Sequence, residues 1–267
     1  MLYRKLHGLP RNRTLVIAHR GGALLWPENT LRAFAAALRL GSDVLEMDVR
    51  QSAEGVPVVI HDETVDRTTN ARGPVRSFRL SELRQLDAAY RFSAIDAPGT
   101  FACRGTGVTI STLREVFQAF PRAFMLVEIK ERDSALADAI LQLVAEFDRD
   151  ERTLLASFHH DMLRHFRGAA PAVATHASRR EAAAFLAAAL LFCARLINPG
   201  YELLLVPPAS GGLPVLTRHF VSAAAGCGLA VGAWTINDAA GMRALARRGV
   251  WGLITDRPDL AVPIVRE

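Results

Sequence analysis

Four charged residues, arranged as two pairs, are the first sign of chemistry in this sequence. Glu46 and Asp48 lie two apart within a Val/Leu/Met-rich run, and Glu128 and Lys130 lie two apart at the end of another apolar run. In a strand, residues two apart project from the same face. Neighbouring carboxylates repel, so burying them requires a divalent metal or a nearby Lys or Arg. Three carboxylates on adjacent strands suit Mg²⁺ or Ca²⁺, and Lys130 can bind an anionic oxygen beside the ion.

Two histidines stand at the ends of further strand-like runs. His19 follows the run Leu15–Ala18 and precedes Arg20, and His61 follows the run Val56–Ile60. Beside a metal and basic groups, such a pair can act as general acid and base near neutral pH. Taken alone, neither histidine is strong evidence. The other histidines show no partner pattern and are interpreted as structural; they are His7, His159, His160, His165, His176 and His219.

Two further residues have both a structural and a functional interpretation. Glu28 lies in the loop that follows Arg20, just before a helix that Asn29 or Thr30 can cap. Trp234, at the end of a late strand-like run, either forms the wall of a pocket or packs in the core. Glycines after Arg20 permit a tight turn and a close approach of the backbone to a ligand.

Short apolar runs that alternate with helical patterns predict an α/β fold. The predicted strands are Leu15–His19, Val44–Val49, Phe124–Ile129, Leu154–Phe158, Ala172–His176, Leu196–Asn198, Ala230–Thr235 and Gly252–Thr255. Eight strands separated by helices are typical of a closed parallel barrel, although an open doubly wound sheet also alternates. The length of 267 residues fits one such domain, residues 1–267. Residues 55–108 break the alternation and are interpreted as an insertion after the second strand.

Composition and charge exclude several classes of protein. Half of the residues are apolar, which excludes a disordered chain. The net charge of +5 comes from scattered residues and gives no reason to expect a nucleic-acid partner. Three cysteines, with no CxxC pair, favour a reducing compartment. With no secretory signal in the first 13 residues, the prediction is a cytoplasmic protein.

The longest apolar stretch, Ala182–Ala194, bears on membrane contact. It has 13 residues, whereas a membrane-spanning helix needs about 20. We therefore expect no membrane span, and interpret the stretch as a buried or half-buried helix followed by a strand. Its arginine flanks also allow a weak contact with a membrane surface.

Together, the motifs resemble the glycerophosphodiester phosphodiesterase family. The resemblance is carried by His19-Arg20-Gly21-Gly22, Pro27-Glu28-Asn29-Thr30, Glu46-Met47-Asp48, His61-Asp62, Asp66-Arg67-Thr68-Thr69-Asn70, Gly73-Pro74-Val75, Glu128-Ile129-Lys130, Ser157-Phe158, Trp234-Thr235-Ile236-Asn237 and Thr255-Asp256-Arg257-Pro258. These segments occur in the family's order and span residues 15–259. The ordered set is highly specific, although no single segment is diagnostic.

The resemblance implies a TIM (β/α)₈ barrel with a segment inserted after the second strand. It implies metal-dependent hydrolysis of glycerophosphodiesters to sn-glycerol 3-phosphate and an alcohol, with Mg²⁺ or Ca²⁺ as the ion. The implied metal ligands are Glu46, Asp48 and Glu128, with Glu28 near the metal. The implied acid/base pair is His19 and His61. Arg20 and Lys130 are the implied phosphate ligands, and Trp234 the residue beside the glycerol.

Two alternatives and two departures accompany this resemblance. The first alternative is a lysophospholipase D activity, in which Ala182–Ala194 and Leu203–Pro208 contact acyl chains. The second is a barrel that binds without catalysis, which the full set of site residues disfavours.

Ser111 stands where the family usually has proline, and Tyr201–Leu213 matches only loosely, so the leaving group is not specified.

Overall fold

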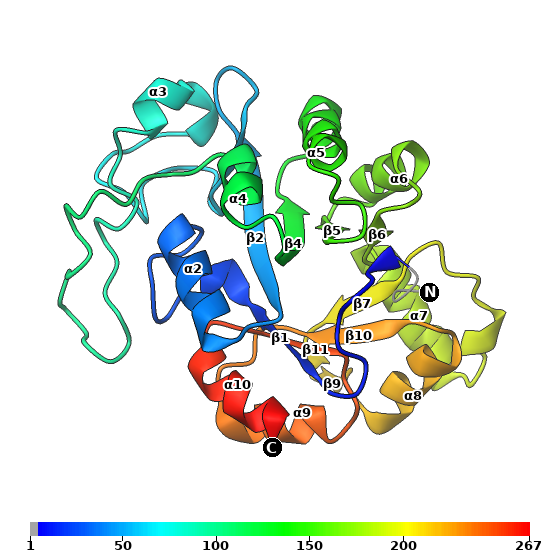
Figure 1. The fold of residues 1–267 in the computed structure, drawn as a ribbon. Helices are drawn as coiled ribbons and strands as arrows, with labels where there is room; N and C mark the ends of the chain where they lie inside the picture. The colour runs from blue at the N-terminus through cyan, green and yellow to red at the C-terminus, as the bar shows by residue number, and fades with distance from the viewer. Residues whose placement is uncertain (1–4) are drawn as a thin grey trace.

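Eight parallel strands, surrounded by helices, form a nearly closed barrel in the computed structural model, which describes residues 5–267 (Figure 1). The strands are β1 (Leu15–Ala18), β2 (Val44–Gln51), β4 (Phe124–Ile129), β5 (Thr153–Ala156), β6 (Ala174–Thr175), β7 (Leu203–Val206), β10 (Ala230–Ala233) and β11 (Gly252–Thr255). Each strand lies beside the next in the chain, and β11 pairs with β1. A single bridge between His176 and Leu203 joins β6 to β7. The prediction of a TIM barrel is confirmed.

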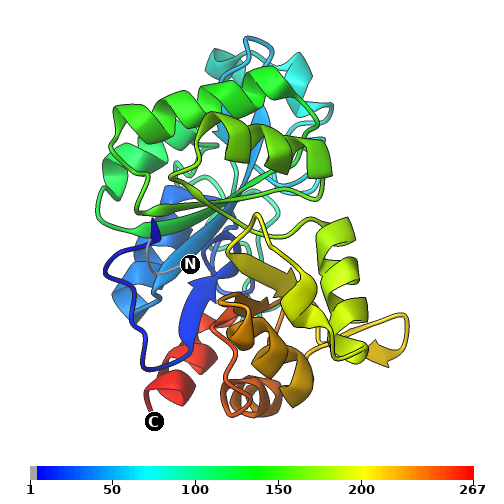
Figure 2. The same cartoon turned by 90° about the vertical axis from the view of Figure 1, so that its right-hand side faces the viewer.

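Helices cover the outer face of the barrel (Figure 2). They are α2 (Leu31–Leu40), α4 (Leu113–Ala119), α5 (Ser134–Glu146), α6 (His160–Ala169), α7 (Arg179–Leu190), α8 (Arg218–Gly226), α9 (Ala239–Ala246) and α10 (Pro258–Arg266). Side chains cap the starts of two of these helices: Thr112 forms a capping box with Glu115, and Asp238 accepts a hydrogen bond from the Gly241 N–H. No helix of the described chain is both long and apolar enough to cross a membrane.

Between β2 and α4 the chain makes a long excursion that projects beside the carboxyl end of β2 (Figure 1). It contains β3 (Pro57–Val59), a 3₁₀ turn η2 (Val75–Ser77) and α3 (Leu80–Leu83). Strand β3 is antiparallel to β2, and the Ile60 N–H donates to the Asp48 carbonyl at 3.0 Å. This pairing brings His61 next to the residues at the end of β2.

One predicted strand is wrong. Residues 196–198 do not form a strand; Ala194–Leu196 form a 3₁₀ turn, η3, and the Leu196 side chain is 85% exposed. The true strand is β7, in the segment that the sequence analysis treated as a loose match. Pro199 and Gly200 explain the shift, because proline lacks a ladder donor and both residues interrupt strands. A short hairpin, β8 (Ala209–Ser210) and β9 (Leu213–Pro214), follows β7 and was not predicted.

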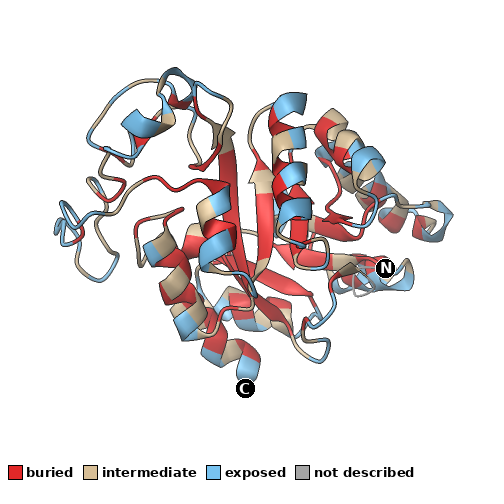
Figure 3. Cartoon of the chain, turned by 45° about the horizontal axis from the view of Figure 1, so that its top comes forward, coloured by how far each residue is buried: buried red, intermediate tan, exposed pale blue. Residues whose placement is uncertain are grey.

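The core is built in layers around the strands, which are buried along nearly their whole length (Figure 3). Inside the barrel, apolar residues such as Ile17, Leu126, Leu154 and Ile254 pack against one another. Outside it, the alternate strand residues pack against the helices. Apolar packing therefore fills the barrel below the carboxyl ends of the strands and leaves polar side chains at that end.

Phe117 provides a test of this packing. Its ring is fully buried between α4 and the barrel, where it contacts Phe147 and the Arg149 guanidinium. We expect Phe117→Ala to lower the free energy of unfolding by about 3–5 kcal/mol, because it leaves a cavity in a close-packed region. Phe192→Ala is the matched control, since that ring is 84% exposed, and its effect is expected to stay within about 0.5 kcal/mol. Urea denaturation measures both, and equal losses would contradict this packing.

Candidate active site

A cavity of about 210 Å³ opens at the carboxyl ends of the barrel strands. Its polar lining consists of His19, Arg20, Glu46, His61, Glu128, Lys130, His176 and Thr235, and Phe158 and Trp234 stand on its wall. Seven of the nine predicted site residues therefore meet in one cavity. The other two, Asp48 and Glu28, lie directly behind it, within hydrogen-bonding distance of the Arg20 side chain. This end of the barrel is where TIM-barrel active sites are built.

Three carboxylates cluster at the base of the cavity. Asp48 on β2 pairs in register with Glu128 on β4, and Glu46 points to the same side as Asp48. One oxygen from each of the three groups lies within 4.8 Å of the others. Burial, together with the charge of Asp48, raises the pKa of Glu46 to about 7. The cluster is thus short of positive charge.

Two cations balance part of this charge. Burial disfavours the charged form of Asp48, but Lys130 and Arg20 outweigh that effect and lower the pKa of its carboxyl. Lys130 Nζ lies 2.9 Å from Asp48 Oδ1 and 2.8 Å from Glu128 Oε1, and Arg20 Nε lies 3.1 Å from Asp48 Oδ2. The backbone N–H of Arg20 donates to Glu46 Oε2 at 2.7 Å.

The carboxylate oxygens of the cluster show whether these residues fit a metal ion. Asp48 Oδ1 and Glu128 Oε1 are buried, and among the described residues both depend on one ammonium group, that of Lys130. Buried carboxylate oxygens are costly unless cations compensate them fully, and one lysine faces two carboxylates here. All three groups offer oxygen, the ligand atom preferred by Mg²⁺ and Ca²⁺. The residues present therefore fit a hard divalent cation.

Each of the two histidines is held by a carboxylate. His19 Nδ1 lies 2.6 Å from Asp256 Oδ1, and His61 Nδ1 lies 2.6 Å from Asp62 Oδ1. A carboxylate at Nδ1 favours the proton on that nitrogen and leaves Nε2 free for a reacting group. The two histidine–carboxylate pairs come from different segments, one after β1 and one after β3, and both histidines line the cavity.

The pKa values of the two histidines move in opposite directions. Burial alone would lower the pKa of His19, but the charge of Glu46 and the hydrogen bond to Asp256 raise it above the ordinary value. Burial lowers the pKa of His61, and the nearby charges of Arg20 and Lys130 add to that effect. One histidine is therefore biased toward its protonated form and the other toward its neutral form, which is the arrangement that acid/base catalysis needs.

Arg67 links the excursion to the barrel. Its guanidinium donates to Asp62 Oδ2 and to Glu28 Oε2, each at 2.7 Å. Glu28 in turn accepts from Arg20 at 3.0 Å. The chain of contacts from His61 to Arg20 thus passes through Asp62, Arg67 and Glu28, so these residues orient the site although they lie outside the cavity.

The turn after β1 depends on two unusual backbone conformations. Arg20 has a φ of 51° and Gly21 a φ of 82°, both in the left-handed region. A Cβ on Gly21 would lie 2.7 Å from the Cβ of Ala33 in α2. The predicted tight turn is confirmed, and the close approach that requires glycine here is to helix α2.

Sequence reasoning missed the roles of two residues near the cluster. Asn29 donates to Asp48 Oδ2 at 2.9 Å, while Thr30 is the residue that caps α2. Asp256, which entered only as part of a segment that carries the family resemblance, orients His19 and accepts from Asn237 Nδ2 at 2.8 Å. Both depend on contacts between residues far apart in the chain, so no local pattern could have identified them.

His176 was interpreted as structural, and it lies on the wall of the cavity. It is buried directly after the end of β6, and its Nε2 accepts a hydrogen bond from the Ser157 N–H at 2.9 Å. Burial lowers the pKa of His176 to about 4, so the ring is neutral at physiological pH. Its position at the junction of β6 and β7 makes it part of the barrel closure as well as of the cavity.

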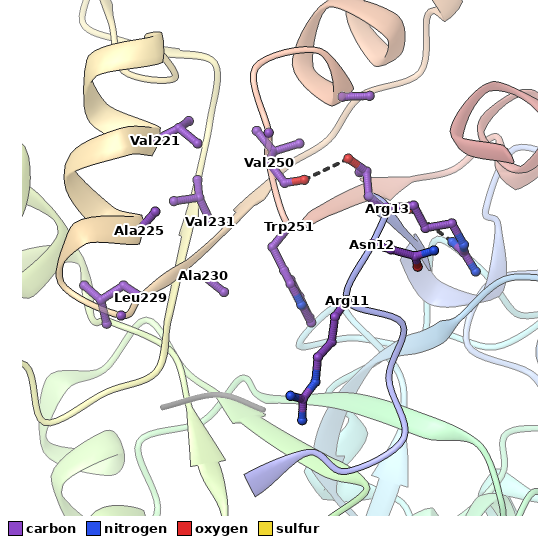
Figure 4. Close-up of a pocket in the computed structure, with 14 residues that line it drawn as sticks. Arg11, Asn12, Arg13, Val221, Ala225, Leu229, Ala230, Val231, Val250 and Trp251 are labelled. Atoms are coloured by element: carbon purple, nitrogen blue, oxygen red, sulfur yellow. Dashed lines mark hydrogen bonds between the residues drawn. The ribbon is translucent and has the colours of Figure 1, made fainter. Parts of the chain in front are cut away.

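A larger cavity, of about 550 Å³, lies at the opposite end of the barrel (Figure 4). Arg11, Arg13, Val250 and Trp251 line it, together with apolar residues of α8 and the start of β10. It adjoins the amino-terminal ends of the strands, the end of a TIM barrel that contributes to stability rather than to catalysis. None of the predicted site residues lines it, so its size does not make it the active site.

The fold and the site define a TIM-barrel protein with an acidic, histidine-flanked cavity. Comparison with known proteins specifies the class further. Residues 19–260 match the profile of the glycerophosphoryl diester phosphodiesterase family. The chain therefore belongs to that family, whose members hydrolyse phosphodiesters.

Three relatives illustrate how far the similarity extends. A glycerophosphodiester phosphodiesterase of Caldanaerobacter subterraneus subsp. tengcongensis is 33% identical over 96% of this chain and 99% of its own length. A phosphodiesterase of Oleispira antarctica, solved in complex with the product sn-glycerol-3-phosphate, is 25% identical, has a TM-score of 0.76 and covers 96% of this chain and 98% of its own. A mouse lysophospholipase D is 33% identical, but over only 58% of this chain and 46% of its own length.

The buried His176 predicts a specific effect of pH on stability. The unfolded chain takes up a proton at this histidine below pH 6.5, whereas the folded protein resists it until about pH 4. Stability is therefore fully present above pH 6.5 and falls as the pH drops toward 4, by about 2 kcal/mol at pH 5.

Urea denaturation of the wild type and of His176→Gln at pH 7.5 and pH 5 measures this effect. Glutamine cannot be protonated in this range, so the variant should lose about 2 kcal/mol less than the wild type between the two pH values. Equal losses in the two proteins would show that His176 is not held neutral in the folded state.

Proposed function

We propose that this protein hydrolyses glycerophosphodiesters to sn-glycerol 3-phosphate and an alcohol, using the residues around the acidic cavity. The observation that carries the proposal is that two carboxylate-held histidines line the same cavity as the three-carboxylate cluster. The name of the Caldanaerobacter relative and the bound product of the Oleispira relative support the same substrate class. The whole chain then works as one domain, because the site draws on both ends of the sequence.

The phosphodiester is proposed to bind between Arg20 and Lys130. Both side chains line the cavity, and each already faces carboxylates that a divalent ion would neutralise. Their release from that pairing would leave two cations directed at the phosphate oxygens. Donors placed where charge develops in the transition state make the largest single contribution to the rate enhancement in many enzymes.

Glu46, Asp48 and Glu128 are the proposed ligands of a divalent metal, Mg²⁺ or Ca²⁺, with Glu28 nearby. When bound, the ion supplies Lewis-acid stabilisation of the phosphoryl oxygens. Asn29 holds the Asp48 carboxylate, and the Arg20 N–H holds Glu46, so the ligand oxygens are fixed before an ion arrives. Hydrogen bonds to the ligating carboxylates set the orientation of metal ligands.

His61 and His19 are the proposed base and acid. The lowered pKa of His61 keeps it neutral and able to accept a proton from the nucleophile at Nε2. The raised pKa of His19 keeps it protonated and able to donate to the departing alkoxide. The phosphorus–oxygen bond to the alcohol breaks. Attack by water gives sn-glycerol 3-phosphate directly, whereas attack by the free glycerol hydroxyl gives a cyclic phosphate that a water molecule then opens to the same product. Trp234 is proposed to stand beside the glycerol.

Two further parts of the proposal concern the surroundings of the protein. A cytoplasmic location remains a prediction from the sequence. A weak contact with a membrane surface is supported by Leu190, Leu191, Phe192 and Leu196, whose side chains are 60–85% exposed near the end of α7 and in η3. Clustered apolar exposure of this kind often marks an interaction surface.

A glycerophosphocholine assay with glycerol 3-phosphate as the readout tests the proposed function. The wild type is expected to release glycerol 3-phosphate in the presence of Mg²⁺ or Ca²⁺. His19→Ala and His61→Ala should each lower kcat by a factor of about 10²–10⁴, the usual contribution of a general acid or base.

The chain offers a matched control for these variants. His165 forms the same 2.6 Å contact with a carboxylate, Asp138, but on the outer surface of the barrel. His165→Ala is expected to leave kcat within about twofold, since it touches no part of the cavity. The proposal would be contradicted if the wild type were inactive with either ion, or if all three variants lost activity alike.

A further inference from the structure

The cavity of about 550 Å³ at the amino-terminal end of the barrel plays no part in the proposed reaction, and we call it the basal cavity. It lies between the segment Arg11–Thr14, the ends of α8 and α9, and the starts of β10 and β11 (Figure 4). Its volume falls within the range of about 300–1,000 Å³ that is typical of small-molecule sites. The composition of its walls indicates what kind of molecule it would hold.

The basal cavity is open because the helix ends beside it carry only small residues. Ala225 and Ala246 lie in the last turns of α8 and α9, and Gly228 and Gly249 follow these helices. A Cβ added at either glycine would meet nothing within 4 Å. The space is therefore produced by the way two helices end, and not by a defect in the core.

The wall formed by α8, β10 and the residue before Trp251 is apolar. Val221, Leu229, Val231 and Val250 line it, and all four are buried members of the core that packs between the barrel and its helices (Figure 4). Because these side chains present only hydrocarbon, this part of the cavity is suited to the apolar body of a ligand.

The opposite wall is basic. Arg11 and Arg13 line it, and no carboxylate of the described chain lines the cavity. Arg13 is paired with Asp43, its Nη1 lying 2.8 Å from Oδ2, whereas the Arg11 side chain is exposed. The carbonyls of Ala225 and Ala246 already accept hydrogen bonds from the N–H groups of the glycines that follow, each at 2.9 Å. Positive charge and hydrogen-bond donors therefore dominate the polar side of the cavity.

Trp251 contributes a donor that lacks an acceptor. The residue is 8% exposed, and its ring points from the start of β11 toward Arg11 (Figure 4). Its Nε1 is buried and donates to no group of the described chain. Buried donors in native proteins are nearly always paired, so an unpaired one in the wall of a cavity indicates an acceptor that a bound molecule supplies.

From these observations we infer that the basal cavity binds an amphipathic carboxylate, that is, a single carboxylate on a hydrocarbon body. The carboxylate lies toward Arg11 and Trp251, and the hydrocarbon lies against Val221 and Leu229. The carboxyl-terminal ends of α8 and α9 carry partial negative charge, which favours a singly charged group over a doubly charged one and keeps it on the arginine side. The inference is independent of the proposed function, because the two cavities lie at opposite ends of the barrel.

Three ligands with the same eight-carbon body test the charge preference. Octanoate, octan-1-ol and octylamine are titrated into chelator-treated protein and followed by calorimetry, so that no metal in the active site can bind the carboxylate. Octanoate is expected to bind about tenfold more tightly than octan-1-ol or better, because hydrogen bonds to a charged group are the stronger ones. Octylamine should give no binding. Hexanoate should bind more weakly than octanoate, by at most about fourfold for each methylene removed.

Matched variants place the binding. Ala225→Trp puts an indole over the basal cavity, and Ala184→Trp makes the same change at an exposed position on α7 outside it. Arg11→Gln removes a charge from the cavity, and Arg39→Gln removes one from the exposed end of α2. We expect Ala225→Trp and Arg11→Gln each to weaken octanoate binding about tenfold, and the two controls to stay within about twofold.

Trp251→Phe isolates the indole donor, because it keeps an aromatic ring and removes the N–H. Octanoate binding should weaken about tenfold, the effect of losing a hydrogen bond to a charged group. Urea denaturation establishes that the variant is folded.

The inference is wrong if octanoate and octan-1-ol bind alike, if octanoate at millimolar concentration does not bind, or if each variant and its control behave alike. Release of glycerol 3-phosphate from glycerophosphocholine is measured in parallel. Ala225→Trp and Arg11→Gln are expected to leave it unchanged, so failure of the inference leaves the proposed function standing, and an inactive wild type that binds octanoate would do the reverse.

Discussion

The structure depends on the packing of three carboxylates, Glu46, Asp48 and Glu128, at the end of two adjacent barrel strands. The register of β2 and β4 places Asp48 opposite Glu128, and the pleat places Glu46 on the same side. Mutual repulsion and lost hydration oppose this arrangement. Arg20 and Lys130 offset part of that cost, yet burial still raises the pKa of Glu46 to about 7. The cluster therefore favours a further cation, which would offset the remaining repulsion.

The rest of the site follows from the need to hold these charges. The left-handed turn at Arg20 directs both its backbone N–H and its guanidinium toward the cluster, and packing of Gly21 against α2 fixes that turn. The excursion after β2 brings His61 to the same cavity, and Arg67 links its partner Asp62 to Glu28. The same electrostatic field separates the pKa values of the two histidines. Catalytic geometry and charge balance are therefore parts of one arrangement.

Much of this architecture could be predicted from the sequence because it is local. The spacing of Glu46 and Asp48 indicates that both side chains lie on the same face of a strand. The alternation of strands and helices predicts the barrel. Leu203–Val206 was missed because a short Leu/Val run beside two prolines looks like a loop, and only pairing with β6 and β10 makes it a strand. Asp256 and Asn29 act through partners 237 and 19 residues away, so no local pattern reveals them.

The most direct test of this account is the effect of divalent ions on unfolding. Mg²⁺ and Ca²⁺ are titrated separately into chelator-treated wild type, Glu128→Gln and Glu151→Gln, the last being a control at an exposed carboxylate, and the free energy of unfolding is measured. An ion that binds only the folded protein adds about 2.7 kcal/mol at 100 times its Kd. The account predicts that at least one ion stabilises the wild type and Glu151→Gln, and that the effect is largely lost in Glu128→Gln. A wild type that neither ion stabilises, or a Glu128→Gln variant stabilised as much as the wild type, would contradict it.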